Sequence, residues 1–449
     1  MSKYLSIVEW VIDNDPHCCG YCKGKGSLSD GVWGHVLSPY DYQDLIDRGW
    51  RRSGKYIYKP QMDKTCCPQF TIRCDVENHH FSKSHKATLY YMRKRLNHGQ
   101  DNMTDSKVKS EIITRMADDP NNSKNIDLEQ RKREDLEGSE KARHKRQLRR
   151  ISKGLPVHKG VLRDPPKLIE QRLEEGLKLT RKNETTFTLT GAKNAMEIEL
   201  VCIGSERDLE TQDESHEVYK KYQVSIHNDD PDDVAKKQWK RFLLDNPFRE
   251  KGKSGHSSGL KLGLYHCQYR LNDKLIAVGV LDFLSESISS VYFYYDTEYE
   301  SLNLGTYSAL VEIYISRFYR FEWYYMGYYI HSCKKMRYKR NFRPSYLACP
   351  KSFEWLPITK SICDLLDKDS HSRLSDENIK DRRSFDLPLN LILNGVGPKV
   401  LYMRQVLSWQ EYLLLVEKEA LEEDDLKIVQ RYCSLMGRDL STAICLYRS

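Results

Sequence analysis

The stretch LYHCQYRLNDKLIAVGVLDFL, residues 264–284, decides the fold expected for this chain. Two runs rich in aromatic and branched apolar residues flank the dipeptide Asn272-Asp273. Two turn-forming residues between strand-like runs are typical of a tight β-hairpin. A third run of the same kind, SISSVYFYYD at residues 287–296, follows a short polar loop. These residues therefore predict three strands at the centre of a sheet.

The neighbouring sequence adds helices and more strands. Helices are expected in 231–248 and 302–320, where apolar residues recur on one face, and strands in 185–204, 219–230 and 321–330. Strands followed by a strand–helix–strand order indicate an α+β, or mixed α/β, domain. We place this domain at residues 186–449, with amphipathic helices closing it near the end of the chain.

Two other segments precede this domain. Residues 1–98 are rich in Cys, Gly, Tyr and Trp, with one short helix expected in SPYDYQDLIDRGW, residues 38–50, capped by Ser38 or Asp41. Residues 99–185 form a charged linker or insertion, because stretches such as DLEQRKREDLEGSEKARHKRQLRRISKG at 127–154 hold too few apolar residues to fold alone. We expect this insertion to be partly disordered or helical.

Composition limits the class of protein. The 449 residues are 39% hydrophobic and 30% charged, and no stretch approaches the roughly 20 apolar residues of a membrane helix. The beginning, MSKYLSIVEWVIDND, lacks the basic start and apolar run of a secretory signal. We therefore expect a monomer of the cytoplasm and nucleus with no membrane partner. The net charge of +8 suits an anionic partner such as RNA, although mild basicity alone accounts for it equally well.

Cysteines occur in pairs at two places. Cys19 and Cys22 lie in DPHCCGYCKGK, residues 15–25, and Cys66 and Cys67 lie in KTCCPQF, residues 64–70. A C-x-x-C spacing lets two thiolates turn toward one ion, and Pro68 favours a turn that brings the adjacent pair to the same centre. Four sulfur ligands suit zinc or an iron–sulfur cluster. The alternatives are unrelated free thiols or a redox pair. Further candidate ligands are Cys18, Cys74, His17, His79, His80 and His85.

Several long motifs resemble one family. They are CGYCKGK (19–25), YDYQDLIDRGWRRSGKYIYKP (40–60), TCCPQFTIRC (65–74), KLIAVGVLDFL (274–284), SSVYFYYD (289–296), SLNLGTYSALVEI (301–313) and YYMGYYIHSCKKMRYKRNFRPS (324–345). Together they closely resemble the eukaryotic arginyl-tRNA–protein transferases of the arginine N-degron pathway. The likeness covers most of the first segment and the core of the third, and little of the charged middle.

The resemblance implies a GNAT-like acyltransferase fold and an aminoacyltransferase activity. Arginyl-tRNA would be the co-substrate, and arginine would pass to proteins that begin with Asp, Glu or oxidised Cys. The product would carry an N-degron for ubiquitin-dependent degradation. The family's four cysteines fall on Cys19, Cys22, Cys66 and Cys67, where an iron–sulfur cluster or zinc would bind.

Attack of an α-amine on an ester needs positioning and a proton acceptor. Asp282 is the first candidate for this base, because it follows an apolar run and should emerge at the end of a central strand. A turn aspartate is the alternative. His266 and Gln268 share one face of their strand and are candidates for binding the amine or the tRNA end, although a structural histidine is about as plausible.

Aromatic and basic side chains supply the candidates for substrate and tRNA binding. Tyr292 and Tyr294 could stack on a terminal adenine, although packing is the better explanation for most of these tyrosines. Arg51 and Arg52 could read an acidic N-terminal side chain or contact tRNA. The segment from 324 to 345 adds a basic cluster with interleaved rings that suits an acceptor stem, against the alternative of a solvated loop; its candidates are Tyr328, His331, Lys335, Arg337 and Lys339.

Neither coenzyme A nor ATP is expected. The motif SLNLGTYSALVEI keeps Gly305 but lacks the second glycine and leading Arg or Gln with which acetyltransferases hold the coenzyme, and the chain has no P-loop motif. Two alternatives remain: an acyl-CoA-dependent N-acyltransferase, and a non-enzymatic tRNA-binding or redox-sensing protein.

Overall fold

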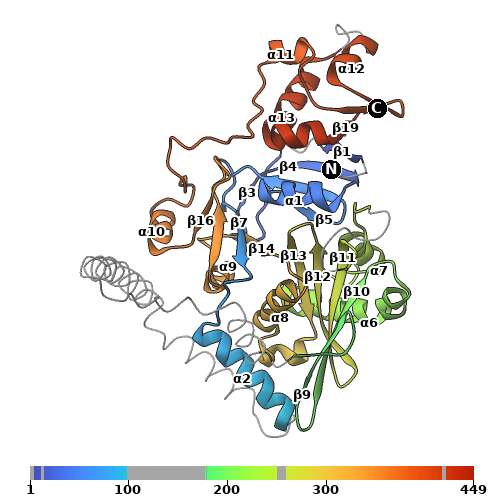
Figure 1. The fold of residues 1–449 in the computed structure, drawn as a ribbon, viewed down its shortest axis with the longest axis vertical. Helices are drawn as coiled ribbons and strands as arrows, with labels where there is room; N and C mark the ends of the chain where they lie inside the picture. The colour runs from blue at the N-terminus through green and yellow to red at the C-terminus, as the bar shows by residue number, and fades with distance from the viewer. Residues whose placement is uncertain are drawn as a thin grey trace, which may run out of the picture.

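The computed structural model describes residues 5–11, 15–98, 177, 179–249, 259–416 and 421–448. Of the charged insertion expected at 99–185, only residues 177 and 179–185 fall within these ranges. Two mixed sheets and the helices packed on them make up the described part (Figure 1).

The predicted hairpin forms the centre of the larger sheet. Strands β11 (Gly263–Leu271) and β12 (Lys274–Phe283) pair antiparallel, and β13 (Ser287–Tyr295) pairs antiparallel with β12. Asn272 and Asp273 both have positive φ, 47° and 67°, as a two-residue hairpin of this type requires. The three central strands are thus confirmed.

The larger sheet extends from this centre on both sides. On one side, β14 (Trp323–Tyr329) runs parallel to β13, and β7 (Phe70–Asp75) pairs antiparallel with β14. The sheet is completed within the described residues by β15 (Ser345–Ala348) and β16 (Trp355–Pro357) beyond β7, and by β10 (Ala195–Cys202), β9 (Thr186–Thr190) and β8 (Thr180–Arg181) beyond β11.

The second sheet joins the two ends of the chain. Strand β1 (Ser6–Val11) pairs in parallel with β19 (Ile444–Tyr447), so both termini lie in the same region of Figure 1. Its other strands are β4 (Ser29–Val36), β5 (Arg51–Ser53), β6 (Tyr56–Pro60), β17 (Val400–Tyr402) and β18 (Gln405–Leu407). A short β2 (His17–Cys18) pairs with β3 (Lys25–Ser27).

The two sheets do not coincide with the segments expected from the sequence, because each contains strands from both the first and the last segment. Strand β7, from the first 98 residues, lies inside the larger sheet, and β17 to β19, from the last segment, lie in the sheet of β1. The boundary expected at residue 98 therefore does not separate two sheets. Strand pairing joins residues far apart in the chain, which composition along the sequence does not record.

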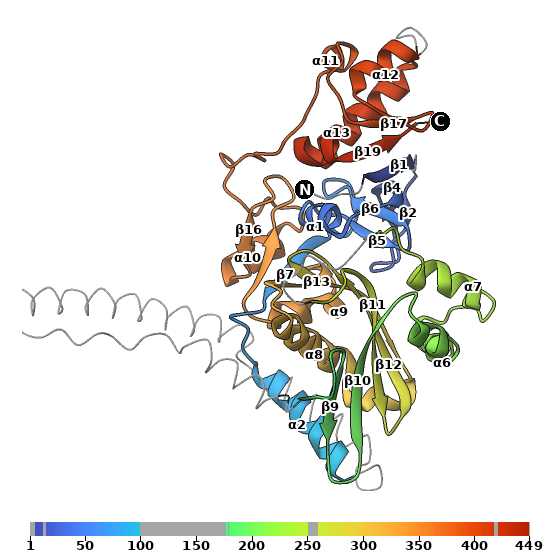
Figure 2. The same cartoon turned by 45° about the vertical axis from the view of Figure 1, so that its right-hand side comes forward.

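Two long helices cover opposite faces of the larger sheet. Helix α6 (Glu206–Tyr222) packs on β12 and β13 from one side, and α8 (Leu304–Phe318), which was expected, packs on β13 and β14 from the other (Figure 2). The strand expected in 219–230 is wrong: these residues end α6 and continue into the turn η1 (Gln223–His227). The buried positions of α6 recur at helical spacing from Asp208 to Tyr219, and this longer period decides the structure.

The remaining helices lie at the periphery. The helix expected at 231–248 is confined to α7 (Lys236–Trp239) and the turn η2 (Lys240–Leu244). Ser38 caps α1 (Pro39–Asp47) as expected. The others are α2 (Lys83–His98), η3 (Thr297–Leu302), α9 (Lys334–Arg337), η4 (Tyr338–Asn341), α10 (Lys360–Lys368), α11 (Leu389–Leu393), α12 (Trp409–Leu415) and α13 (Glu423–Ala443).

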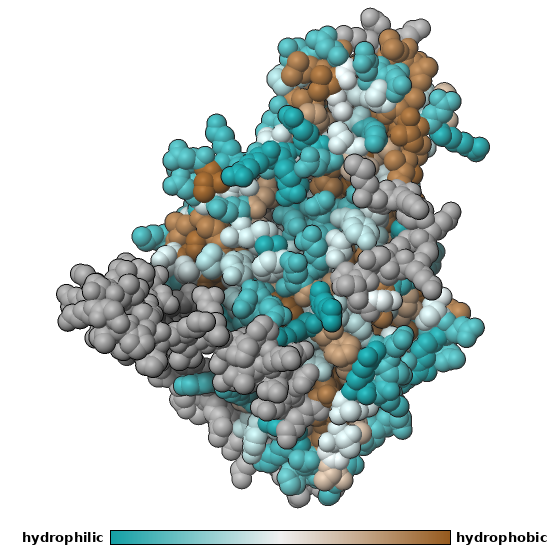
Figure 3. Space-filling model, viewed as in Figure 1, coloured by the Kyte–Doolittle hydropathy of each residue, from teal (hydrophilic) through white to brown (hydrophobic). Residues whose placement is uncertain are grey.

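The surface is mixed in character. Hydrophilic side chains cover the region of α6 and α7, whereas hydrophobic ones gather near the C-terminus (Figure 3). Exposed apolar side chains in that region include Met403, Leu414 and Leu415. Among the described helices, none combines the length and the apolar character that crossing a membrane requires.

Candidate active site and metal centre

A cavity opens where two central strands stop pairing. Strands β13 and β14 pair only from Ser287 to Ser289 with Trp323 to Tyr325. Beyond this point β14 carries a register shift and Gly327, whose φ is +65°. The cavity, of about 420 Å³, lies in this gap and is lined by the free parts of both strands, by α8, by α9 and by N-terminal residues. Interrupted pairing in a sheet thus provides a binding site at its centre.

Asp282 lies in a buried ion pair beside this cavity. Its carboxylate accepts hydrogen bonds from Arg52 Nε (2.8 Å) and Nη2 (2.5 Å), and its side chain is completely inaccessible to solvent. Burial raises the pKa of Asp282, and the Arg52 guanidinium opposes this effect. Asp282 lies at the end of a central strand, as predicted, because β12 ends at Phe283, but it is buried between the paired neighbours of that strand. The structure therefore assigns it to holding Arg52, which lines the cavity.

Arg51 differs from its neighbour. Its guanidinium donates to three carbonyl oxygens, those of Ile46, Trp50 and Gly327, and stands 5.0 Å from the centre of the Tyr328 ring. No carboxylate forms an ion pair with it within the part of the chain that the structure describes, and its Nε has no hydrogen-bond partner there. Arg51 lines the cavity and is 94% buried, with 6% exposed. Its positive charge is therefore available to an anionic ligand.

Glu312 was missed by the sequence analysis. It lies in the middle of α8, is 1% exposed and lines the cavity. The Tyr324 hydroxyl donates to Oε2 (2.5 Å), while Oε1 has no hydrogen-bond partner. Burial raises the pKa of Glu312 from 4.5 to about 7. The sequence did contain a cue for this residue, since Glu312 is a single carboxylate inside the apolar run SALVEIYIS, residues 308–316. A buried charge without a partner is rare and often has a function.

Three other predicted residues lie away from the cavity. The His266 ring faces α7 and η2, 3.4 Å from the Leu243 carbonyl oxygen, and Gln268 faces α6, where it donates to the Thr211 hydroxyl (2.7 Å). Tyr294 is completely buried beside α6, where its hydroxyl lies 2.8 Å from that of Ser215. Contact with substrate stays a prediction for these three residues, and α6, α7 and η2 lie between their face of the sheet and the surface. Tyr292 alone of this strand's two predicted tyrosines lines the cavity.

The basic segment is divided by burial. Lys335 is exposed and lines the cavity. Lys339 also lines it, but its ammonium donates to the carbonyl oxygens of Met326 and Tyr328 (both 2.7 Å), and burial lowers the pKa of Lys339 to about 7. The Lys339 ammonium is therefore held by the backbone, and its contact with tRNA stays a prediction.

His331 and Arg337 support the backbone in this region. The His331 ring lies between the Tyr329 hydroxyl (2.7 Å) and the Asp367 carboxylate (2.9 Å) and is 3% exposed. Arg337 donates to the His331 carbonyl oxygen. Neither lines the cavity, so direct contact of His331 with a ligand there is corrected. Tyr328 does line it, and its hydroxyl donates to the Gly49 carbonyl oxygen (2.8 Å).

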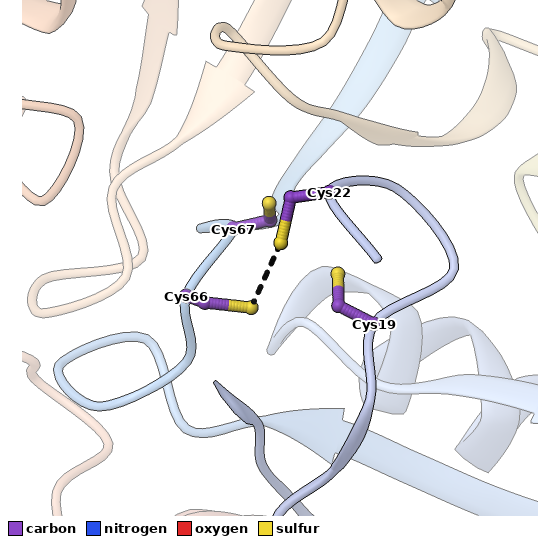
Figure 4. Close-up of side chains that lie close together, drawn as sticks. All are labelled: Cys19, Cys22, Cys66 and Cys67. Atoms are coloured by element: carbon purple, nitrogen blue, oxygen red, sulfur yellow. Dashed lines mark hydrogen bonds between the residues drawn. The ribbon is translucent and has the colours of Figure 1, made fainter. Parts of the chain in front are cut away.

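Four cysteines converge beside the cavity, as predicted. The sulfurs of Cys19, Cys22, Cys66 and Cys67 all lie within 4.8 Å of one another, and Figure 4 shows them facing one another from two loops. The Cys66 amide donates to the Gly26 carbonyl oxygen (2.9 Å), which joins the two loops. Hydrogen bonding, first from the Gly24 backbone, lowers the pKa of Cys22 to about 7. Thiolates bind metal, so this donor set fits a metal ion.

The metal centre and the cavity share a wall. Tyr21, between Cys19 and Cys22 in sequence, lines the cavity, and Met336 packs against Cys19 and Cys67 while also lining the cavity. Of the further ligand candidates, Cys18, Cys74 and the nearby histidines are not part of the cysteine group found in the described residues. His79 and His85 are buried against Phe342 instead.

Together, the fold and site define a mixed α/β protein in which four cysteines that could hold a metal lie beside a charged, aromatic cavity. The family described as "Arginine-tRNA-protein transferase" matches with its N-terminal part over residues 17–87 and with its C-terminal part over 214–349. The chain is 35% identical to arginyl-tRNA–protein transferase 1 of Drosophila melanogaster, over 83% of this chain and 86% of that protein.

Other relatives extend the comparison. Arginyl-tRNA–protein transferase 2 of Arabidopsis thaliana is 31% identical, over 80% of this chain and 76% of the relative. An aspartate/glutamate leucyltransferase of Campylobacter jejuni is 32% identical, over 24% of this chain and 45% of the relative. The chain belongs to the arginyl-tRNA–protein transferase family.

Proposed function

We propose that this protein transfers arginine from arginyl-tRNA to the N-terminal amine of proteins that begin with Asp, Glu or oxidised Cys. The names of its relatives support the transfer of arginine. In the reaction, the amine attacks the ester carbonyl, an amide C–N bond forms, and the ester C–O bond breaks. The amine loses a proton, and the released ribose hydroxyl gains one. The cavity between β13 and β14 carries the proposal, because it can hold the ester and the amine together.

The preference for acidic N-termini rests on Arg51. A buried guanidinium without a carboxylate partner favours an incoming carboxylate or sulfonate, since it has lost its water and gained no counter-charge. The exposed Lys335 adds a second positive charge to the lining. A shared choice of acceptor is also supported by the Campylobacter relative, whose name joins aspartate and glutamate to a different donor amino acid.

The finer fold assignment is GNAT-like. In that fold, a parallel strand pair that opens beside the first turn of a helix holds the acyl donor. Here β13 and β14 stop pairing beside Gly305, in the first turn of α8, and Gly305 lines the cavity. We propose that the aminoacylated end of tRNA occupies this position and that the exposed Lys334 and Lys335 contact its phosphates.

The metal centre accommodates one tetrahedral ion. Four sulfurs around zinc stand about 3.8 Å apart, given Zn–S bonds of about 2.3 Å. The Cys22 and Cys66 sulfurs are 3.6 Å apart, and the whole group lies within 4.8 Å. We favour zinc over an iron–sulfur cluster, in which the four cysteines would be divided among two or four irons. Bound metal would hold the two loops together and so place Tyr21 in the cavity wall.

The proposal is tested by transfer of labelled arginine from charged tRNA to two peptides that differ only in an N-terminal Asp or Ala. The protein is purified without oxygen, and its metal is measured by elemental analysis. Label on the Asp peptide alone, abolished by ribonuclease, is the expected result. Bound tRNA without labelled product would overturn the transferase assignment, and equal labelling of both peptides would overturn the acid specificity.

A further inference from the structure

Glu312 is a buried carboxylate that lines the cavity without a counter-charge. It is the one acidic residue among the described lining residues, whereas Arg51, Arg52, Lys335 and Lys339 supply four basic ones. Its side chain is 1% exposed, and it forms no ion pair with any described residue. An anionic ligand is therefore attracted to the basic residues, and a cationic group to Glu312.

The geometry around Glu312 leaves one oxygen free for a ligand. Oε2 accepts from Tyr324, but Oε1 has no partner. Oε1 lies over Gly279 on β12, where a Cβ would stand 2.7 Å from it, so the glycine makes room for the carboxylate itself. An unpaired buried oxygen is costly in the empty site and is satisfied when a donor enters.

The position of Glu312 also restricts which part of the substrates can reach it. The reactants carry three cationic groups: the α-ammonium of the acceptor peptide, the α-ammonium of the arginyl ester and the arginyl guanidinium. The two α-amino groups stay at or next to the reacting carbonyl, whereas the arginyl side chain carries its cation at its far end and can reach a buried carboxylate. Its planar guanidinium can donate two hydrogen bonds to one carboxylate and stack on aromatic rings, and the rings of Tyr324 and Tyr338 line the cavity beside Glu312.

We propose that Glu312 binds the guanidinium of the arginyl group in the cavity and so selects arginyl-tRNA over other charged tRNAs. This inference rests on the proposed function. The two substrates are then recognised by residues of opposite charge. Glu312 binds the cationic side chain of the donor, and Arg51 binds the anionic side chain of the acceptor.

The test uses one tRNA charged by an acylating ribozyme with arginine, lysine or citrulline, a neutral analogue of arginine. Transfer to an Asp-starting peptide is measured for the wild type, Glu312→Gln and Glu312→Asp. We expect Glu312→Gln to lower transfer of arginine on the order of 100-fold. Transfer of citrulline should stay the same or rise, so the preference of the wild type for arginine is lost. Glu312→Asp should fall between the two.

The control is Ser316→Ala, one turn further along α8, where the hydroxyl donates to the Glu312 carbonyl oxygen and does not line the cavity. It should keep the wild-type preference. An equal loss for all three amino acids in Glu312→Gln would show a role in the chemical step common to them and overturn the inference, as would an unchanged preference. Thermal unfolding of each variant separates loss of folding from loss of selectivity.

A binding measurement decides the inference if the wild type transfers none of the three amino acids. That result would refute the proposed function alone. Calorimetry with 3′-arginylamido-3′-deoxyadenosine, which carries an amide in place of the ester, would still compare the wild type with Glu312→Gln. Weaker binding on the order of 100-fold supports the role of Glu312, and equal binding overturns it.

Discussion

Asp282 and Glu312 are both buried carboxylates of the larger sheet and its helix, yet their surroundings differ. Asp282 is neutralised by two hydrogen bonds from Arg52, which fix the guanidinium in place. Glu312 accepts a hydrogen bond from the Tyr324 hydroxyl, has no cationic partner among the described residues and keeps Oε1 unpaired. The two arginines differ in the same way: Arg52 has a carboxylate partner, and Arg51 has none among the described residues. The paired charges stabilise the fold, whereas the unpaired charges are available to bind a ligand.

The strongest test of this contrast is Asp282→Ala. Removing the carboxylate leaves Arg52 buried without a counter-charge, so the free energy of unfolding should fall by about 3–5 kcal/mol. Urea unfolding followed by circular dichroism measures the change. The double variant Asp282→Leu with Arg52→Met should recover part of the loss, because no charge is left unpaired. A single variant as stable as the wild type would refute the structural role of the pair.

Whereas the paired Asp282 stabilises the folded protein, the ionised Glu312 should destabilise it, and this effect should depend on pH. Because its folded pKa is raised from 4.5 to about 7, its contribution to stability is complete below pH 4.5 and is lost as the pH rises through about 7. Relative to Glu312→Gln, the wild type should therefore lose on the order of 3 kcal/mol across this range. Chemical unfolding at successive pH values measures the difference. Ser316→Ala keeps Glu312 and serves as control, because it should show the same pH dependence as the wild type. A wild type that gains stability relative to Glu312→Gln as the pH rises would contradict the assignment.

Arg51→Ala sharpens the contrast between the two arginines. We expect kcat/KM for Asp-starting peptides to fall on the order of 30- to 100-fold, since the acidic side chain loses a charged donor. Transfer to an Ala-starting peptide should change much less. Lys55→Ala, at a nearby cation that does not line the cavity, is the control. The same loss with both peptides would indicate a general effect on the site.

The smallest effect is expected for Tyr294→Phe. This variant removes the hydrogen bond with Ser215 in the core, so the free energy of unfolding should fall by about 1 kcal/mol with no change in transfer. Thermal unfolding and the transfer assay are measured on the same preparation. A large loss of transfer would indicate that Tyr294 does contribute to substrate binding.

The sequence by itself determined the hairpin at 264–284, helix α8 and the group of four cysteines. These features depend on local rules: apolar periodicity, a turn dipeptide with positive φ, and ligand spacing along the chain. The tertiary structure decided which charges are paired. Asp282 and Arg52 are hydrogen-bonded although they are 230 residues apart in the sequence. Strand β7 pairs within a sheet whose other strands come from the last segment or its border. Burial and pairing are properties of such distant contacts, so only the folded chain separates the structural Asp282 from the unpaired Glu312.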